Sequence, residues 1–143
     1  MKRTVEKTKL HRKLPHLGVY TRLRPSKIRK GGVGVFAIRN IKKGTNIFPD
    51  DTARLVWIHR NQLRGVPKEL RQLYEDFPAI KDKGSLYGCP KSFNLLTVPW
   101  YINESKTNPN VVCDQSTYNF FTKRNIKAGE ELTVNYDTYN EFR

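Results

Sequence analysis

The sequence predicts a mainly β fold, in which several short strands and one helix form a single domain. Short runs of alternating, β-branched or aromatic residues are separated by glycine turns, and only one stretch has the apolar spacing of a helix. A chain of 143 residues is the size of one domain and buries roughly two-thirds of its unfolded surface. Its seven Tyr, seven Phe and two Trp argue against disorder.

The expected strands are short, and each lies next to a turn signal. They cover residues 19–23, 33–38, 45–48, 54–58, 111–113, 118–123 and 132–136. Residues 81–99 contain two glycines and two prolines and are expected to be irregular. A helix should begin at Pro67 and end at Pro78, since proline suits the first helical turn. Its apolar face at i, i+3, i+4 and i+7 consists of Leu70, Leu73, Tyr74 and Phe77.

Two six-residue segments echo each other, RNIKKG at 39–44 and RNIKAG at 124–129. Each follows an expected strand and leads into another. Their separation of 85 residues is far too long for a solenoid repeat. We interpret them as one turn geometry that the chain uses twice.

The positive charge is concentrated near the N-terminus. Residues 1–30 carry 11 Lys or Arg and one acid, a net charge of +10, whereas residues 101–143 are near neutral at −1. We expect residues 1–16 to form a basic arm and residues 17–143 to form the folded domain. Such an arm attracts nucleic-acid phosphates or other polyanions, although a solvated tail explains the charge equally well.

No metal site or membrane segment is expected. Cys89 and Cys113 form no CxxC pair, and His11, His16 and His59 lack metal-ligand spacing. Two reduced, mostly buried thiols are typical of a cytoplasmic protein. The sequence has no run of about 18 apolar residues and no apolar core of a signal peptide, so neither a membrane span nor export is expected.

Three motifs contain residues that ordinary core packing does not require. The GxG at 32–34 lacks the third glycine of a dinucleotide site and the GK[ST] of a P-loop, so a tight hairpin turn explains it alone. Residues 101–110, YINESKTNPN, place polar groups in an aromatic run, where a turn with self-satisfied Asn side chains explains them. Residues 129–136, GEELTVNY, enter a strand that ends in a half-buried tyrosine.

In this order, the three motifs resemble the SET domain family of protein-lysine methyltransferases, over about residues 17–140. The segments GEELTVNYD at 129–137 and GVGVFAIRNIKKGT at 32–45 are the most specific. The resemblance implies a β-clip arrangement of several small sheets. It also implies a knot-like crossing, in which the C-terminal segment passes through a loop near Asn103. Such threading is rare, and it would bring distant motifs to one site.

The resemblance implies S-adenosylmethionine as the cofactor, no metal, and a lysine-bearing protein as the substrate. The implied cofactor-binding residues are Gly32, Val33, Gly34, Tyr101, Asn103, Glu104 and Tyr136. The implied lysine channel is lined by Tyr118, Val134, Tyr139 and Phe142. Tyr136 matches the catalytic tyrosine of the family. We expect it to orient the reactants rather than to act as a base, because in-line methyl transfer depends on alignment and a neutral amine.

The sequence departs from the family pattern in three places. Glu104 replaces the usual His, and the segment from Asn103 to Pro109 is one residue longer than the common form. No cysteine follows Tyr136, so the zinc-binding tail of many relatives is absent. Residues 87–93, Tyr139, Phe142 or a second copy of the chain would then close the lysine channel. Glu130 and Glu131 are adjacent on a strand and face opposite ways, so we interpret them as turn and surface acids or partners of Lys or Arg, not as a catalytic pair.

Three functions remain open from the sequence. The first is a methyltransferase whose target belongs to a nucleoprotein, which would associate it with ribosomes, a nucleoid or chromatin. The second is an inactive SET scaffold that binds nucleic acid or protein through residues 1–30. The third is a small β-rich protein whose motifs are coincidental.

Overall fold

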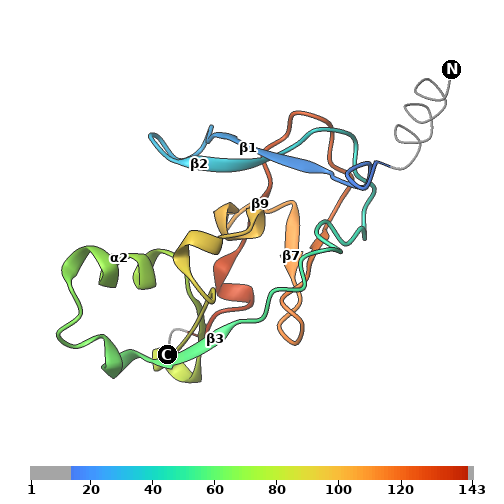
Figure 1. Ribbon diagram of the computed structural model, residues 1–143. Coiled ribbons are helices and arrows are strands. Elements are labelled where there is room, and N and C mark those ends of the chain that lie inside the picture. Colours follow the sequence, from blue (N-terminus) through green and yellow to red (C-terminus); the bar gives the residue numbers. More distant parts are fainter. Residues whose placement is uncertain (1–13, 142–143) are drawn as a thin grey trace, which may run out of the picture.

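The computed structural model describes residues 14–141, so most of the predicted arm and Phe142 lie outside the described residues. Within residues 14–141 the chain forms nine strands in three small sheets and one α-helix (Figure 1). The prediction of a mainly β fold with several small sheets is confirmed.

The three sheets are formed by three successive stretches of the chain. The first is the antiparallel hairpin β1 (Thr21–Pro25) and β2 (Val33–Ala37). The second has the order β3-β5-β4, comprising β3 (Val56–His59), β5 (Leu86–Cys89) and β4 (Ala79–Lys81). The third has the order β6-β9-β7-β8, comprising β6 (Asn103–Glu104), β9 (Thr133–Val134), β7 (Val111–Cys113) and β8 (Phe120–Thr122).

One predicted strand is absent, and one segment predicted to be irregular contains a strand. Residues 45–48 form only a single bridge, between Asn46 and Phe121, rather than a strand. Residues 81–99 are not wholly irregular, because they contain β5. The strand was not predicted because it contains Gly88. A glycine inside a strand usually weakens it, but it also allows another group to approach closely. That group is the ring of Trp57 on β3, which would lie 2.8 Å from a Cβ at this position.

The predicted helix is α2 (Lys68–Asp76), which directly follows Pro67. It lies to one side of the molecule (Figure 1). None of its residues is fully buried, and Leu70 is 42 % exposed. The helix contacts the rest of the protein through an aromatic pair, in which the ring centroids of Tyr74 and Phe93 are 4.9 Å apart. The amphipathic pattern therefore predicted the helix correctly but overstated its burial.

The main core lies between the hairpin and the third sheet. Its fully buried side chains come from both halves of the chain and include Val35, Ile41, Val111, Ile126, Leu132 and Val134. A smaller cluster beside α2 is formed by Leu63, Ile80, Tyr87 and Cys89. Both cysteines are buried and unpaired, as predicted.

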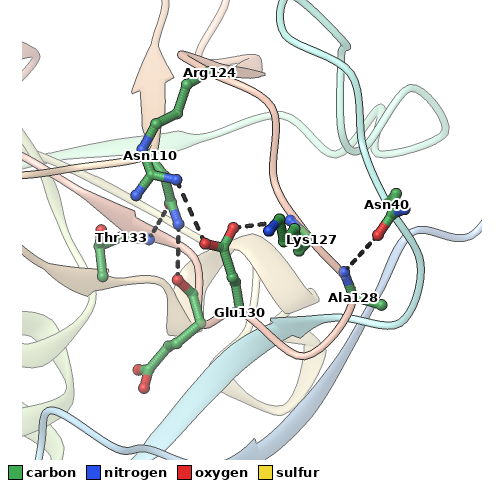
Figure 2. Close-up of polar contacts among 8 residues, drawn as sticks. Asn40, Asn110, Arg124, Lys127, Ala128, Glu130 and Thr133 are labelled. Carbon is green, nitrogen blue, oxygen red and sulfur yellow. Dashed lines mark hydrogen bonds and ion pairs between the residues drawn. The ribbon is translucent and has the colours of Figure 1, made fainter.

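The C-terminal segment is threaded between two consecutive strands. β9 lies between β6 and β7 and is parallel to both, so the six residues 105–110 that join β6 to β7 must cross over it. The Asn110 amide holds the crossing, because it donates to the Glu131 carbonyl at 2.9 Å and accepts from the Thr133 amide at 2.8 Å. Figure 2 shows the second of these bonds. This is the predicted knot-like crossing.

The two echoing turns pair with each other about an approximate two-fold axis. Ile41 and Ile126, both fully buried, exchange two backbone hydrogen bonds of 2.8 Å. The Asn40 side chain accepts from the Ala128 amide at 2.9 Å (Figure 2), and the Asn125 side chain accepts from the Lys43 amide at 2.8 Å. The shared geometry was predicted, but the pairing was not.

Asn40→Ala and Asn125→Ala should therefore destabilise the fold equally. Each variant loses one side-chain acceptor for a backbone amide on the opposite turn, at a cost of about 1 kcal/mol. Urea unfolding measures both free energies. Asn61→Ala, an exposed change on a short 3-10 turn, is the control and should leave stability unchanged. A large loss in one variant and none in the other would contradict the two-fold pairing.

Candidate functional site

Three distant segments meet at the Glu131 carboxylate. Its Oε2 atom accepts from the Ser26 hydroxyl at 2.7 Å and from the Asn103 amide at 3.1 Å. Its Oε1 atom accepts from the backbone amide of Lys27 at 2.7 Å. The hairpin turn, the Asn103 motif and the C-terminal motif are therefore joined by one charged group, through hydrogen bonds of the stronger, charge-assisted kind.

The GxG motif contacts the same cluster. Asn103, which is 6 % exposed, also donates to the Val33 carbonyl at 2.9 Å. A Cβ on Gly34 would collide with the Glu131 carboxylate, so this glycine is required by close approach of a side chain. Gly32 belongs to the hairpin turn, where its amide donates to the Arg29 carbonyl at 2.9 Å. The motif is thus both a hairpin turn and one wall of the cluster.

Tyr136 lies immediately beyond the crossing and is held at two atoms. Its hydroxyl donates to the Ile102 carbonyl at 2.6 Å, and its amide donates to the Glu104 carboxylate at 3.1 Å. Burial, and secondarily the Glu104 charge, raise the pKa of Tyr136 to about 12, against an opposing effect of Arg29. The phenol is therefore neutral and oriented near pH 7.

The four residues of the predicted lysine channel have different surroundings. Tyr139 packs edge-on against Tyr136 at 6.3 Å between centroids, and its pKa is raised mainly by burial. Tyr118 packs against the same core with a positive φ of 58°. Val134 is wholly enclosed in the core, with no exposed surface, and Phe142 lies outside the described residues.

Tyr101, predicted to bind the cofactor, packs at the end of α2. Its ring meets that of Phe77 edge-on at 5.6 Å between centroids. Its backbone belongs to the short 3-10 turn that leads into β6 and the Asn103 motif. Tyr101 is thus close in sequence to the cluster, and its side chain contacts the helix.

A groove of about 840 Å³ lies beside the cluster, a size typical of small-molecule sites. It is lined by both charge signs, with the carboxylates of Glu104 and Glu131 and the cations of Lys27, Arg124 and Lys127. Such a lining suits a ligand that carries both positive and negative groups. Within residues 14–141, no cluster of His, Cys, Asp and Glu could hold a metal ion. The same part of the chain has no helix long and apolar enough to cross a membrane.

The two adjacent glutamates bind different partners. Glu130 pairs with Arg124 at 3.6 Å and accepts from the Lys127 amide at 2.9 Å, as Figure 2 shows. Glu131 differs from the surface acid that we predicted, because it is half-buried among Ser26, Lys27 and Asn103.

Sequence reasoning missed Glu131, Ser26 and Asn110 as residues of the site. The available signal was the alternation of the C-terminal motif. Leu132 and Val134 are fully buried, so Glu131 and Thr133 face the other side of the same segment, toward the groove.

The sequence and the fold both have known relatives. The SET domain family matches residues 32–137, most of the chain. A protein of Plasmodium falciparum named a candidate histone methyltransferase aligns with a TM-score of 0.52 and 21% identity, over 82% of this chain and 93% of its own. The methyltransferase domain of human PR domain-containing protein 2 aligns with a TM-score of 0.54 and 20% identity, over 89% and 81%.

A humanized mutant of Polycomb Repressive Complex 2 from Chaetomium thermophilum aligns with a TM-score of 0.55 and 22% identity, over 85% of this chain and 15% of that one. None of the curated proteins matches the chain. At these identities the solved structures establish the likeness of the fold. The family match covers well over half of the sequence, and the chain therefore belongs to the SET domain family.

Proposed function

We propose that the chain transfers a methyl group from S-adenosylmethionine to a lysine side chain of a protein. The observation that carries the proposal is the convergence of Gly34, Asn103 and Tyr136. The first two share the Glu131 cluster, and Tyr136 is bonded to the residues on either side of Asn103. Residues of the three motifs thus meet at one cluster, and Glu104 and Glu131, from two of these motifs, line the groove beside it.

The groove fits this cofactor chemically. S-adenosylmethionine carries a sulfonium, an amino group, a carboxylate and ribose hydroxyls. Glu104 and Glu131 are suited to its cations and hydroxyls, and Lys27 and Arg124 are suited to its carboxylate. When bound, the cofactor supplies an electrophilic methyl group.

Tyr136 is suited to hold the amine rather than to deprotonate it. Its hydroxyl hydrogen is directed to the Ile102 carbonyl, so its oxygen remains able to accept an N–H from a lysine amine. With a pKa of about 12 it is essentially never ionised near pH 7. A free lysine has a pKa of about 10.4, and burial beside aromatic rings favours its neutral, nucleophilic form. Alignment of this amine is the contribution expected of the protein.

Transfer of labelled methyl groups from the cofactor to lysate proteins tests the proposal. The wild-type protein should label lysine residues. Tyr136→Phe should reduce labelling by about 10²-fold, the loss typical when one preorganised hydrogen-bonding group is removed. Tyr74→Phe, which removes a hydroxyl on α2, is the matched control. No transfer by the wild type, or full activity of Tyr136→Phe, would reject this function.

Glu104 should be compatible with cofactor binding despite replacing histidine. Its carboxylate accepts from the Tyr136 amide, a role that the amide oxygen of Gln can also fill. Calorimetry should detect cofactor binding by the wild type and by Glu104→Gln and Glu104→His, with affinities within about tenfold of one another. Absence of binding by both the wild type and Glu104→His would reject the idea.

A second function, nucleic-acid binding, is favoured by the outer face of the hairpin. Arg22 and Arg24 extend from the same face of β1, and together with Lys27 they line a hollow of about 700 Å³ that contains no acidic residue. This face continues the basic character of the N-terminal segment into the folded domain. We propose that it contacts phosphate groups, which would bring the enzyme to a nucleoprotein target.

The salt dependence of RNA or DNA retention tests this contact. The double change Arg22→Gln and Arg24→Gln should lower the slope of log affinity against log salt by about 2, since each phosphate contact adds roughly one unit. Arg71→Gln on the exposed face of α2 is the control. An unchanged slope in the double variant would contradict a role for this face.

A further inference from the structure

Lys81, the last residue of β4, places its ammonium group against two neighbouring aromatic rings. Its Nζ atom lies 5.3 Å from the ring centroid of Trp57 and 5.3 Å from that of Tyr118. The two rings are 6.2 Å apart and inclined at 49°, so they form two walls of one site. Cations at this distance from an aromatic face are attracted by the ring quadrupole.

The two rings are fixed by features that a surface contact would not need. Trp57 lies across Gly88, where any side chain would collide with its ring. Tyr118 adopts a φ of 58°, a strained backbone for a bulky residue that is typical of functional sites. The cation site is therefore a built part of the fold.

The Tyr118 hydroxyl is buried and has no hydrogen-bond partner among the described residues. Buried hydroxyls are rarely left unpaired, so its position needs an explanation. Burial raises the pKa of this phenol, the proximity and charge of Lys81 oppose the rise, and the Glu141 carboxylate adds to it. Within residues 14–141 Lys81 forms no ion pair with an acid, and its ammonium lies against the two rings.

The site adjoins the residues assigned to the lysine channel. Tyr118 is itself one of them, and both Tyr118 and Tyr136 lie close enough to Tyr139 to influence its pKa. β4 is also tied to the segment after Tyr136, because the Ile80 amide donates to the Asn140 side chain at 2.8 Å. An ammonium at Trp57 and Tyr118 thus lies next to the aromatic cluster that surrounds the proposed catalytic tyrosine.

We propose that Trp57 and Tyr118 form the entrance site for the ammonium group of a substrate lysine, and that Lys81 is its internal occupant. An incoming lysine must displace the Lys81 side chain, which makes Lys81 a built-in competitor that restrains the enzyme. This inference rests on the proposed methyltransferase function. The Lys81 side chain is long and unbranched, so it can leave the rings by changing rotamers while β4 stays paired to β5.

Fluorescence titration tests the site without requiring activity. Trp100→Phe leaves Trp57 as the one tryptophan, and n-butylammonium, with sodium chloride as the ionic-strength control, mimics a lysine side chain. In this background Lys81→Met should bind n-butylammonium about tenfold more tightly than the parent. Lys83→Met, which removes an exposed charge two residues away, should match the parent. If Lys81→Met fails to fold by circular dichroism, Lys81→Gln replaces it. Equal affinities, or no saturable binding by the Lys81 variant, would overturn the inference.

Methyl-transfer kinetics separate this inference from the function on which it rests. With a lysine peptide as substrate, Lys81→Met should lower KM about tenfold and leave kcat unchanged. If Lys81 had only a structural role, its replacement would instead reduce kcat or raise KM. Either result would overturn the inference about Lys81 but would not contradict the proposed methyltransferase function. Tight n-butylammonium binding without methyl transfer by any variant would reject the proposed function and support the cation site alone.

Discussion

The structure depends on the insertion of β9 between β6 and β7. These two strands are joined by only six residues, and β9 comes from a segment that follows them by about twenty residues in the chain. An inserted strand of two residues cannot be held by its own ladder alone, so side chains complete it. Asn110 binds the backbone on both sides of Leu132, and Ser105 donates its amide to the Val134 carbonyl at 3.0 Å. The crossing brings Glu131 and Tyr136 to the Asn103 motif.

The paired turns hold the other end of the same segment. Their two-fold arrangement binds the exit of β2 to the entry of the C-terminal motif, and it buries Ile41 against Ile126. Leu132 is then drawn into the core by a backbone bond of 2.7 Å to the Val35 carbonyl. Since Leu132 faces inward, Glu131 must face the hairpin turn, where it meets Ser26 and Asn103. A hydrophobic constraint thereby positions a charged group.

The groove and the aromatic cluster around Tyr136 differ in charge and in burial. At the groove, carboxylates are held by hydrogen bonds and remain suited to bind cationic groups. Beyond Tyr136, aromatic rings surround hydroxyls whose pKa values are raised by burial. This division suits the proposed methyl transfer, which needs a cationic donor on one side and a neutral amine on the other. The ammonium of Lys81 lies against the rings of Trp57 and Tyr118.

Local periodicity, turn residues and short spacings predicted the mainly β fold, the single helix and the order of the motifs. The resemblance of those motifs to SET domains predicted the family. The sequence could not place β5, because the reason for Gly88 is the ring of Trp57, which is distant in the chain. The three-dimensional structure was needed to show that Glu131 joins three segments, that the two turns pair, and that Lys81 lies against Trp57 and Tyr118. Each of these is a contact between distant residues, and a single sequence carries no signal for which distant side chains will meet.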